Sequence, residues 1–416
     1  MSARRSGLAR SMLGWVALLL CAGGAAAEAP DAPSVEVLFE VRLCADDESA
    51  AVEIHVEQQG GQLRRLRFAL PDERMRGFEG DGEIREASGE VVWVLPRLGG
   101  SLRYMAVVDH LRDPAEYDAR CTDDWALLRG SDLVPIATAT VVEGSVARTR
   151  LRFRLPSGWQ VVTPFEAIEP RLYRIDRPGR LFEAPRGWIM AGDLRVLDAE
   201  IGSTRVTFAS PAGQETRDRD RRALLRWALP VLNEILGTAS RRWLVVSADD
   251  PMWRGGLSGP DSLYLHADRP LIAPDDTSPL LHEIVHVAMG AEAGPESDWI
   301  VEGLAELYSL ELLRRAGALS GPEWERALAG MRKEAAGVES LAEGPTTGDA
   351  TKRAVLVLHE LDRRIRSVTK GDASLDDVLR RLVEGDREPL TKDGLQRLVE
   401  SLTGDSMDSF FGSLPD

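Results

Sequence analysis

The sequence predicts an α+β protein with more than one domain, in which an antiparallel β-sandwich-like part precedes a part with a small sheet and many helices. The chain has 416 residues, of which 44% are hydrophobic and 28% charged, enough for two or three packed domains. Short runs of alternating apolar and polar residues dominate the first half, and longer segments with helical periodicity dominate the second half. This composition excludes a disordered or membrane-embedded chain.

A secretory signal is expected at residues 1–27. The segment begins with three arginines, continues with an apolar run from Met12 to Ala22 and ends in an Ala-Ala-Ala site at 25–27. This order is typical of a bacterial-type signal peptide, and the apolar run is short for a membrane span. We therefore expect an exported protein, periplasmic or secreted, without stable membrane insertion after cleavage. An N-terminal anchor that stays uncleaved is the alternative.

Charge and cysteine content narrow the expected partners and compartment. The formal net charge is -16, which disfavours binding to nucleic acid or to an anionic membrane. After removal of residues 1–27 the chain keeps two cysteines, Cys44 and Cys121. An oxidising compartment would allow them to form a disulfide, and two separate buried thiols are the alternative.

The N-terminal β-domain is expected at residues 34–195. Residues 35–162 contain runs such as VEVLFEV, AVEIHVE, EVVWVL and TRLRFRLP. A period of two, broken by Gly and Pro, predicts a largely antiparallel domain. This domain shows no catalytic pattern, and we expect it to wall a substrate cleft or to bind a partner.

A second domain is expected at residues 200–416, with a sheet and helix part at 200–277, two helices at 278–316 that carry the motifs described next, and C-terminal helices at 320–416. The runs TRVTF and RRWLVVS predict strands at 204–208 and 241–247, and a helix from 219 to 236 ends at Gly237. Further helices are predicted at 279–289, 298–315, 352–368, 374–383 and 392–402.

The segment LLHEIVHVAMG contains the pattern H-E-x-x-H. It places His282 and His286 one turn apart on the same face of a helix, where two imidazoles can hold one metal ion. Glu283 lies on an adjoining stripe, from which a carboxylate can act as the base on a metal-bound water. The chain has only six histidines, so a chance match to this pattern would be rare.

A catalytic zinc needs a third protein ligand and one open position. Glu302 is our candidate, because it lies sixteen residues after His286 on a helix that Asp298 is expected to cap. Gly303 would allow close helix contact near the metal. Glu306, one turn further on, is expected to accept the second ring proton of a zinc histidine, with a solvated helix charge as the alternative.

These residues resemble the gluzincin peptidases and, within them, the glycyl aminopeptidase family. The features that carry the resemblance are the H-E-x-x-H helix, the W-x-x-E-G motif at 299–303, the Gly255-Gly256-Leu257 segment and the stretch 356–382. The resemblance implies an N-terminal β-domain joined to a thermolysin-like catalytic domain, one Zn²⁺ ion and a peptide or protein substrate. It also implies that Gly255, Gly256 and Ser258 contact the substrate.

Two departures from the family pattern affect the expected activity. Ser258 stands where the family has an acid that holds a substrate amine, and Ala350 stands where related enzymes have a tyrosine that stabilises the oxyanion. The loss of one such donor typically costs about a hundredfold in rate. Four other side chains are candidates for that role, although each also fits an ordinary packed position: Tyr264, His266, Tyr308 and His359.

The sequence thus predicts an exported zinc peptidase, an aminopeptidase or an endopeptidase, with Glu283 as general base. One alternative is a weak or inactive pseudo-peptidase that acts as a periplasmic binding or adaptor protein. A second alternative is a purely structural zinc site, which would need a fourth protein ligand.

Overall fold

The computed structural model describes residues 34–46, 48–70, 74–175, 182–237, 241–385 and 388–414. The predicted signal peptide lies outside the described residues. Pro33–Asp416 forms one compact unit. None of the described helices is both long enough and apolar enough to cross a membrane.

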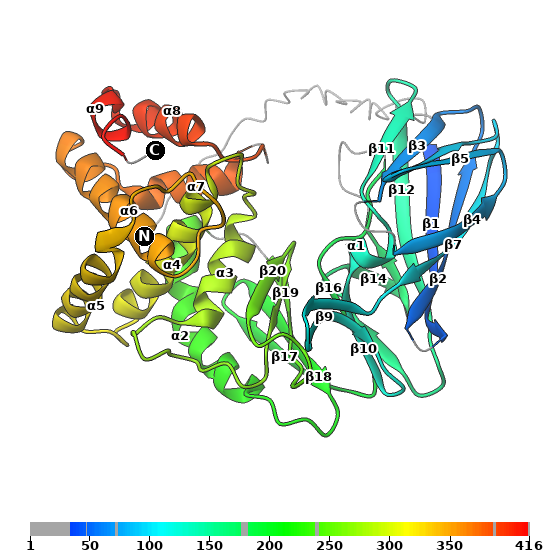
Figure 1. Cartoon of the computed structure of the whole chain (residues 1–416), viewed down its shortest axis with the longest axis horizontal. Coiled ribbons are helices and arrows are strands. Elements are labelled where there is room, and N and C mark those ends of the chain that lie inside the picture. Colours follow the sequence, from blue (N-terminus) through cyan, green and yellow to red (C-terminus); the bar gives the residue numbers. More distant parts are fainter. Residues whose placement is uncertain are drawn as a thin grey trace, which may run out of the picture. The chain divides into compact units, whose positions relative to one another are not determined.

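The strands of the N-terminal part form three sheets within the described residues, shown in blue to green in Figure 1. The first sheet has seven strands, in the order β14 (Glu166–Glu169), β15 (Leu172–Arg174), β12 (Val146–Arg154), β1 (Ser34–Asp46), β2 (Ser49–Gln58), β7 (Gly99–Val107) and β4 (Met75–Gly80). The second has four strands, in the order β11 (Ala137–Val141), β3 (Leu63–Ala69), β6 (Glu90–Val94) and β5 (Glu83–Ala87).

The third sheet has five strands, in the order β13 (Gln160–Val162), β16 (Trp188–Gly192), β10 (Trp125–Arg129), β9 (Glu116–Cys121) and β8 (His110–Asp113). A short helix, α1 (Gly130–Leu133), follows β10. The pairing in these sheets is antiparallel as predicted, except that β1 and β12 run parallel. The sequence did not predict that pair, because an alternating strand looks the same in either direction.

The period of two divides β1 between core and solvent. Val37, Phe39 and Val41 are fully buried, while the intervening side chains lie on the other face of the sheet, beside side chains of the neighbouring strand β12. There Arg154 donates to Glu40, an exposed ion pair of small energetic value. At the end of the strand, Cys44 and Cys121 form a disulfide with their Cα atoms 5.9 Å apart, which ties β1 to β9.

A fourth sheet carries the later half of the chain. Its order is β17 (Leu194–Ile201), β18 (Thr204–Pro211), β19 (Arg241–Val246), β21 (Ser262–Leu265) and β20 (Gly256–Gly259). The three central strands are parallel and the two edge strands antiparallel. β17 begins directly after β16 and spans the predicted boundary at 195–200, and Trp188 of β16 packs on Tyr264 of β21. The division into two domains therefore stays a prediction.

Helices form most of the remaining chain (Figure 1). They are α2 (Asp218–Leu236), α3 (Pro279–Met289), α4 (Asp298–Arg315), α5 (Gly321–Glu334), α6 (Asp349–Val368), α7 (Leu375–Glu384), α8 (Lys392–Thr403) and α9 (Asp408–Phe411), with a 3₁₀ turn at Ala335–Gly337. The predicted bounds of α3 and α4 match the observed ones, whereas α6 begins three residues earlier than predicted, at Asp349.

Gly303 explains how α4 meets its neighbour. A Cβ atom at this position would lie 2.7 Å from Ala354 Cβ and 2.8 Å from Leu358 Cδ1, both on α6. The glycine therefore permits close packing of α4 on α6, not on the helix that carries the two histidines. The predicted cap is also corrected: Ser297 occupies the N-cap position, and Asp298 is the first helical residue.

Candidate metal centre and active-site cleft

Helix α3 presents the two histidines. Ser278 begins the helix by accepting a hydrogen bond from Leu281 N at 3.4 Å, and Gly290 ends it in the left-handed conformation. The apolar face is completely buried, which fixes the rotation of the helix. The side chains of His282 and His286 lie on the other face, 18% and 10% exposed.

Helix α4 brings Glu302 to both histidines. Its Oε2 lies 3.3 Å from His282 Nε2 and its Oε1 lies 3.4 Å from His286 Nε2. The two Nε2 atoms are 3.0 Å apart. The connection between α3 and α4 is held by Gly294 N, which donates to Leu390 O at 2.8 Å.

These separations fit a single zinc ion. Ligands about 2.1 Å from a tetrahedral metal lie about 3.4 Å from one another, close to the spacings of His282, His286 and Glu302. Within the described residues, no other group of three His, Cys, Asp or Glu side chains brings its ligand atoms so close together. The set supplies two nitrogens and one carboxylate, which leaves the fourth position of a catalytic site open.

Glu306 lies behind this cluster, where the sequence predicted it. Its Oε2 is 2.8 Å from His282 Nδ1. A carboxylate at this distance holds the proton on Nδ1 and turns the lone pair of Nε2 toward the metal position. Glu306 is only 16% exposed, so the alternative of a solvated helix charge does not describe it.

The charges of the cluster are strongly coupled. Burial alone would raise the pKa of Glu302, but hydrogen bonds from His282 and His286 outweigh it and lower that pKa to about 2. Burial alone would lower the pKa of His282, but its bonds to Glu302 and Glu306 raise it to about 10. A metal ion would take the place of the proton on Nε2, since zinc binds the neutral imidazole.

Glu283 is packed against the edge strand β20, and Figure 1 shows α3 beside that strand. A Cβ atom on Gly256 would lie 2.7 Å from Glu283 Oε1, so glycine at this position leaves room for the carboxylate where it lies. Burial raises the pKa of Glu283, and the charges of His282 and His286, with a smaller contribution from the backbone N–H of Ser258, partly oppose that rise. A raised pKa suits a group that must take up a proton and release it.

A cleft of about 640 Å³ opens over the cluster. It is lined by β20 and the segment before it, the segment between β21 and α3, the helices α3, α4 and α6, the segment before α6 and a side chain from the N-terminal part. The lining residues are Arg112, Trp253, Gly256, Leu257, Ser258, Arg269, Asp275, Thr277, Pro279, His282, Glu283, His286, Asp298, Glu302, Glu306, Pro345, Thr346, Thr347, Gly348, Thr351 and Lys352. Gly255 lies just outside this lining, beneath the ring of Trp253.

The sequence analysis missed Arg112, Trp253 and Arg269 as cleft residues. Arg112 and Trp253 lie far apart in the chain and meet only because β9 is hydrogen-bonded to the segment before β20. A single arginine in a strand shows no sequence pattern that predicts its position in the cleft.

Neither tyrosine predicted as an oxyanion donor lines the cleft. The hydroxyl of Tyr264 donates to Trp253 O at 2.8 Å, and that of Tyr308 donates to Asp376 Oδ1 at 2.8 Å. Both side chains are buried, which raises the pKa of each. These two predictions are therefore corrected, because each hydroxyl forms a hydrogen bond inside the protein and does not face the cleft.

The two predicted histidine donors are corrected as well. His266 is fully buried, and its Nδ1 accepts from Asp268 N at 3.2 Å. His359 lies edge-on to Trp324, with ring centroids 5.9 Å apart. The polar groups that do face the cleft from α6 and the segment before it include Thr347, Thr351 and Lys352.

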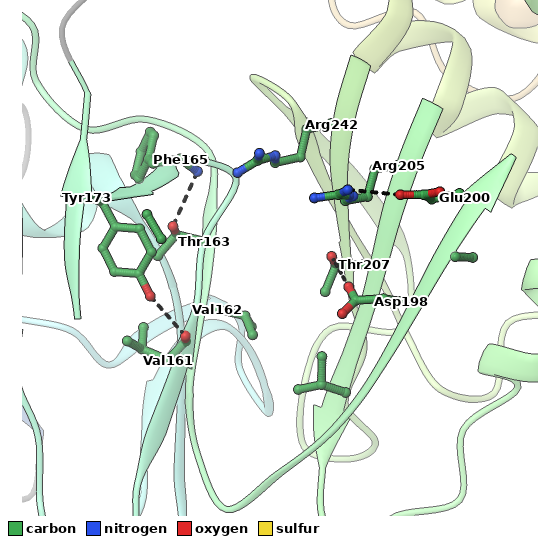
Figure 2. A pocket seen from close by; sticks show the side chains of 13 residues that line it. Val161, Val162, Thr163, Phe165, Tyr173, Asp198, Glu200, Arg205, Thr207 and Arg242 are labelled. Carbon is green, nitrogen blue, oxygen red and sulfur yellow. Dashed lines mark hydrogen bonds and ion pairs between the residues drawn. The ribbon is translucent and has the colours of Figure 1, made fainter. Parts of the chain in front are cut away.

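A second cavity, of about 560 Å³, shares no lining residue with the cleft (Figure 2). Its carboxylates are already bonded: Thr207 donates to Asp198 at 2.6 Å, and Arg205 donates to Glu200 at 2.8 Å. Both carboxylates that line this cavity therefore have a partner.

Several solved structures have a similar fold. An aminopeptidase N family protein from Idiomarina loihiensis matches with a TM-score of 0.69 at 13% identity, over 91% of this chain and 76% of that one. An M1 zinc metallopeptidase from Deinococcus radiodurans, in a mutant form bound to a Tyr-Ser-Ala substrate, matches with a TM-score of 0.59 at 16% identity, over 93% and 96% of the two chains. This chain has the fold of M1 zinc metallopeptidases.

The same fold extends to a larger protein. Legionella pneumophila aminopeptidase A, in complex with aspartic acid, matches with a TM-score of 0.58 at 13% identity, over 94% of this chain and 50% of that one. No family model matches the sequence, and no curated protein does. The structural neighbours confirm the predicted α+β class and the likeness to gluzincin peptidases at the level of the fold.

Proposed function

We propose that this protein is an exported zinc metallopeptidase that hydrolyses peptide bonds. The observation that carries the proposal is the convergence of His282, His286 and Glu302 at zinc-ligand spacing beside the buried carboxylate Glu283. The M1 fold of its structural neighbours supports the same reaction class.

The residues have separate roles in this proposal. His282, His286 and Glu302 would hold one zinc ion, and Glu306 orients His282. Zinc, when bound, polarises the scissile carbonyl and lowers the pKa of a water molecule. Glu283 takes a proton from the attacking water and passes it to the leaving nitrogen. Gly256 leaves the space in which this carboxylate sits.

Export is part of the proposal and rests on the pattern of residues 1–27. The disulfide between Cys44 and Cys121 supports it, because such bonds persist in oxidising compartments. A periplasmic or secreted location follows. The experiment is fractionation of the full-length chain, with N-terminal sequencing of the exported form; a protein found in the cytoplasm would contradict export.

The decisive experiment for the peptidase is the Glu283→Gln variant. It keeps the ligand set but removes the base, so we expect zinc content to stay the same and peptide hydrolysis to fall by about a hundredfold to ten-thousandfold. The measurement is metal analysis together with digestion of an unbiased peptide library. Equal hydrolysis by variant and wild type would refute the assigned base.

The same digest separates the remaining alternatives. Trimming from the N-terminus would identify an aminopeptidase, and internal cuts an endopeptidase. Bound zinc without hydrolysis by the wild type would identify the pseudo-peptidase. A structural zinc site has no support in the described residues, where no fourth His, Cys, Asp or Glu completes the group.

A further inference from the structure

Two arginines line the metal cleft and have no part in the proposed proton transfer. Arg112 lies on β8 in the N-terminal part, and Arg269 lies between β21 and α3. Their presence is unexpected in a protein with a formal net charge of -16. Within about 8 Å, however, local charges act on a ligand more strongly than the screened net charge does.

Main-chain hydrogen bonds from β9, the strand paired with the β8 strand of Arg112, place this arginine beside the edge strand β20. Tyr117 N donates to Pro251 O at 2.9 Å, and Trp253 N donates to Tyr117 O at 2.8 Å. The guanidinium of Arg112 then lies 4.2 Å from the centroid of the Trp253 ring. That ring in turn packs on Gly255, where a Cβ atom would lie 2.0 Å from it. Arg112 is thus held next to the strand that packs on Glu283.

The charge of Arg112 is only weakly compensated. Its ion-pair partner is Asp118, at 3.9 Å, beyond hydrogen-bond distance. Asp118 is engaged more closely by His110 at 2.5 Å and by Arg129 at 3.5 Å. The side chain of Arg112 is 39% exposed, so its donors remain accessible from the cleft. Arg269 makes no ion pair within the part of the chain that the structure describes.

Of the five carboxylates that line the cleft, Glu283 is buried against β20 and the other four accept hydrogen bonds or pair with other residues of the chain. Glu302 and Glu306 bind the two imidazoles. Asp298 accepts from Thr346 N at 2.8 Å, and Asp275 accepts from the hydroxyl of Thr277 at 2.8 Å. On the strand wall itself, the lining residues are Arg112, Trp253, Gly256, Leu257 and Ser258, of which Arg112 is the charged one, so the charge at this wall of the cleft is positive. Such a wall attracts a carboxylate and disfavours an ammonium group.

We propose that Arg112, assisted by Arg269, binds a carboxylate of the substrate, so that the cleft selects peptides with an acidic group near the scissile bond. Guanidinium pairs with carboxylate through parallel hydrogen bonds, which gives direction as well as affinity. The carboxylate is either an acidic side chain or a C-terminus. The inference rests on the proposed peptidase function, since it names the substrate class of the same cleft.

The test measures binding to the zinc-loaded Glu283→Gln protein, so that hydrolysis does not interfere. Fluorescence anisotropy would compare four labelled peptides of equal length: a neutral peptide with blocked ends, one with a central glutamate, one with a central lysine, and one with neutral side chains, a blocked N-terminus and a free C-terminus. We expect at least one carboxylate peptide to bind roughly tenfold to a hundredfold more tightly than the neutral one. The peptide that gains shows which carboxylate is recognised.

Substitutions then assign the effect to the arginines. Arg112→Gln should remove most of the preference, and Arg112→Glu should turn it toward the lysine peptide. Arg148→Gln is the matched control, because Arg148 lies on β12, is 71% exposed and pairs with Glu36 instead of facing the cleft. Melting temperature and zinc content, measured on each variant, show that it is folded.

Two results would overturn the proposal: equal binding of all four peptides, or a preference that survives both Arg112→Gln and Arg269→Gln. If Arg112→Gln does not fold, Arg269→Gln and the four-peptide comparison still decide. A carboxylate preference in a wild-type protein that cleaves no peptide would refute the proposed peptidase and leave the recognition in place. The two failures are therefore distinguishable.

Discussion

The two walls of the cleft are built in different ways. One wall comes from α3 and α4, which follow each other in the chain and carry His282, His286, Glu302 and Glu306. The opposite wall combines β20 with Trp253 and with Arg112 from the N-terminal part. Two helices that are adjacent in the chain create the first wall, and contacts between distant segments create the second. The helical wall should therefore control metal binding, and the strand wall should control the base and the substrate.

The strongest test of the helical wall is His286→Ala. Removing one of three ligands leaves a site that cannot hold zinc firmly, so we expect loss of both bound metal and peptidase activity. Metal analysis after dialysis and a peptide assay measure the two effects. Full zinc occupancy in this variant would show that the ligand set is wrong.

Gly256→Ala tests the strand wall. The added methyl group would meet Glu283 Oε1 at 2.7 Å and displace the base, so we expect kcat to fall by about tenfold to a hundredfold while zinc is retained. Gly330→Ala is the control, because nothing lies within 4 Å of the corresponding position on α5. If both variants keep full activity, Gly256 does not position the base.

Glu306→Gln tests whether the carboxylate of Glu306 supports zinc binding through its hydrogen bond to His282. The amide holds the ring proton less strongly than the carboxylate at 2.8 Å, so zinc affinity should fall by roughly tenfold to a hundredfold. Titration with a competing chelator measures it, and Glu325→Gln on the exposed face of α5 serves as control. An unchanged affinity would assign Glu306 to packing alone.

The smallest effect is expected from Tyr308→Phe. Because the hydroxyl bonds Asp376 outside the cleft, its loss should lower the free energy of unfolding by about 1 kcal/mol and leave kcat unchanged. Denaturant unfolding and the peptide assay test both statements. A large fall in kcat with unchanged stability would restore Tyr308 as a catalytic donor.

Much of the helical wall was predictable because its signals are local. The spacing of His282 and His286 follows from the helical period, and Ser278, Pro279 and Gly290 mark the ends of α3. The bounds of α4 and the place of Glu302 on it follow in the same way. The hydrogen bond between Glu306 and His282 was predicted on the same grounds. Glu306 lies one turn beyond Glu302 on α4, and residues one turn apart share a helix face.

The oxyanion candidates show a feature that local sequence patterns did not predict, namely which side chains face the cleft. Tyr264, Tyr308, His266 and His359 have suitable chemistry, but the structure buries or packs each of them outside the cleft. Which way a tyrosine or histidine faces depends on the element packed against it, and the sequence does not show that element. The parallel pairing of β1 and β12 escaped prediction for the same reason.

From the sequence alone we predicted the fold class, the two helices of the metal centre and the ligand set His282, His286 and Glu302, because strand alternation, helical spacing and short motifs depend on near neighbours in the chain. That the two helices pack so that these side chains meet was decided by the tertiary structure. Only the tertiary structure decided that Gly256 makes room for Glu283, that Gly303 faces α6 and that Arg112 reaches the cleft. Each of these depends on which distant segments pack together, and packing of that kind leaves no period in the sequence.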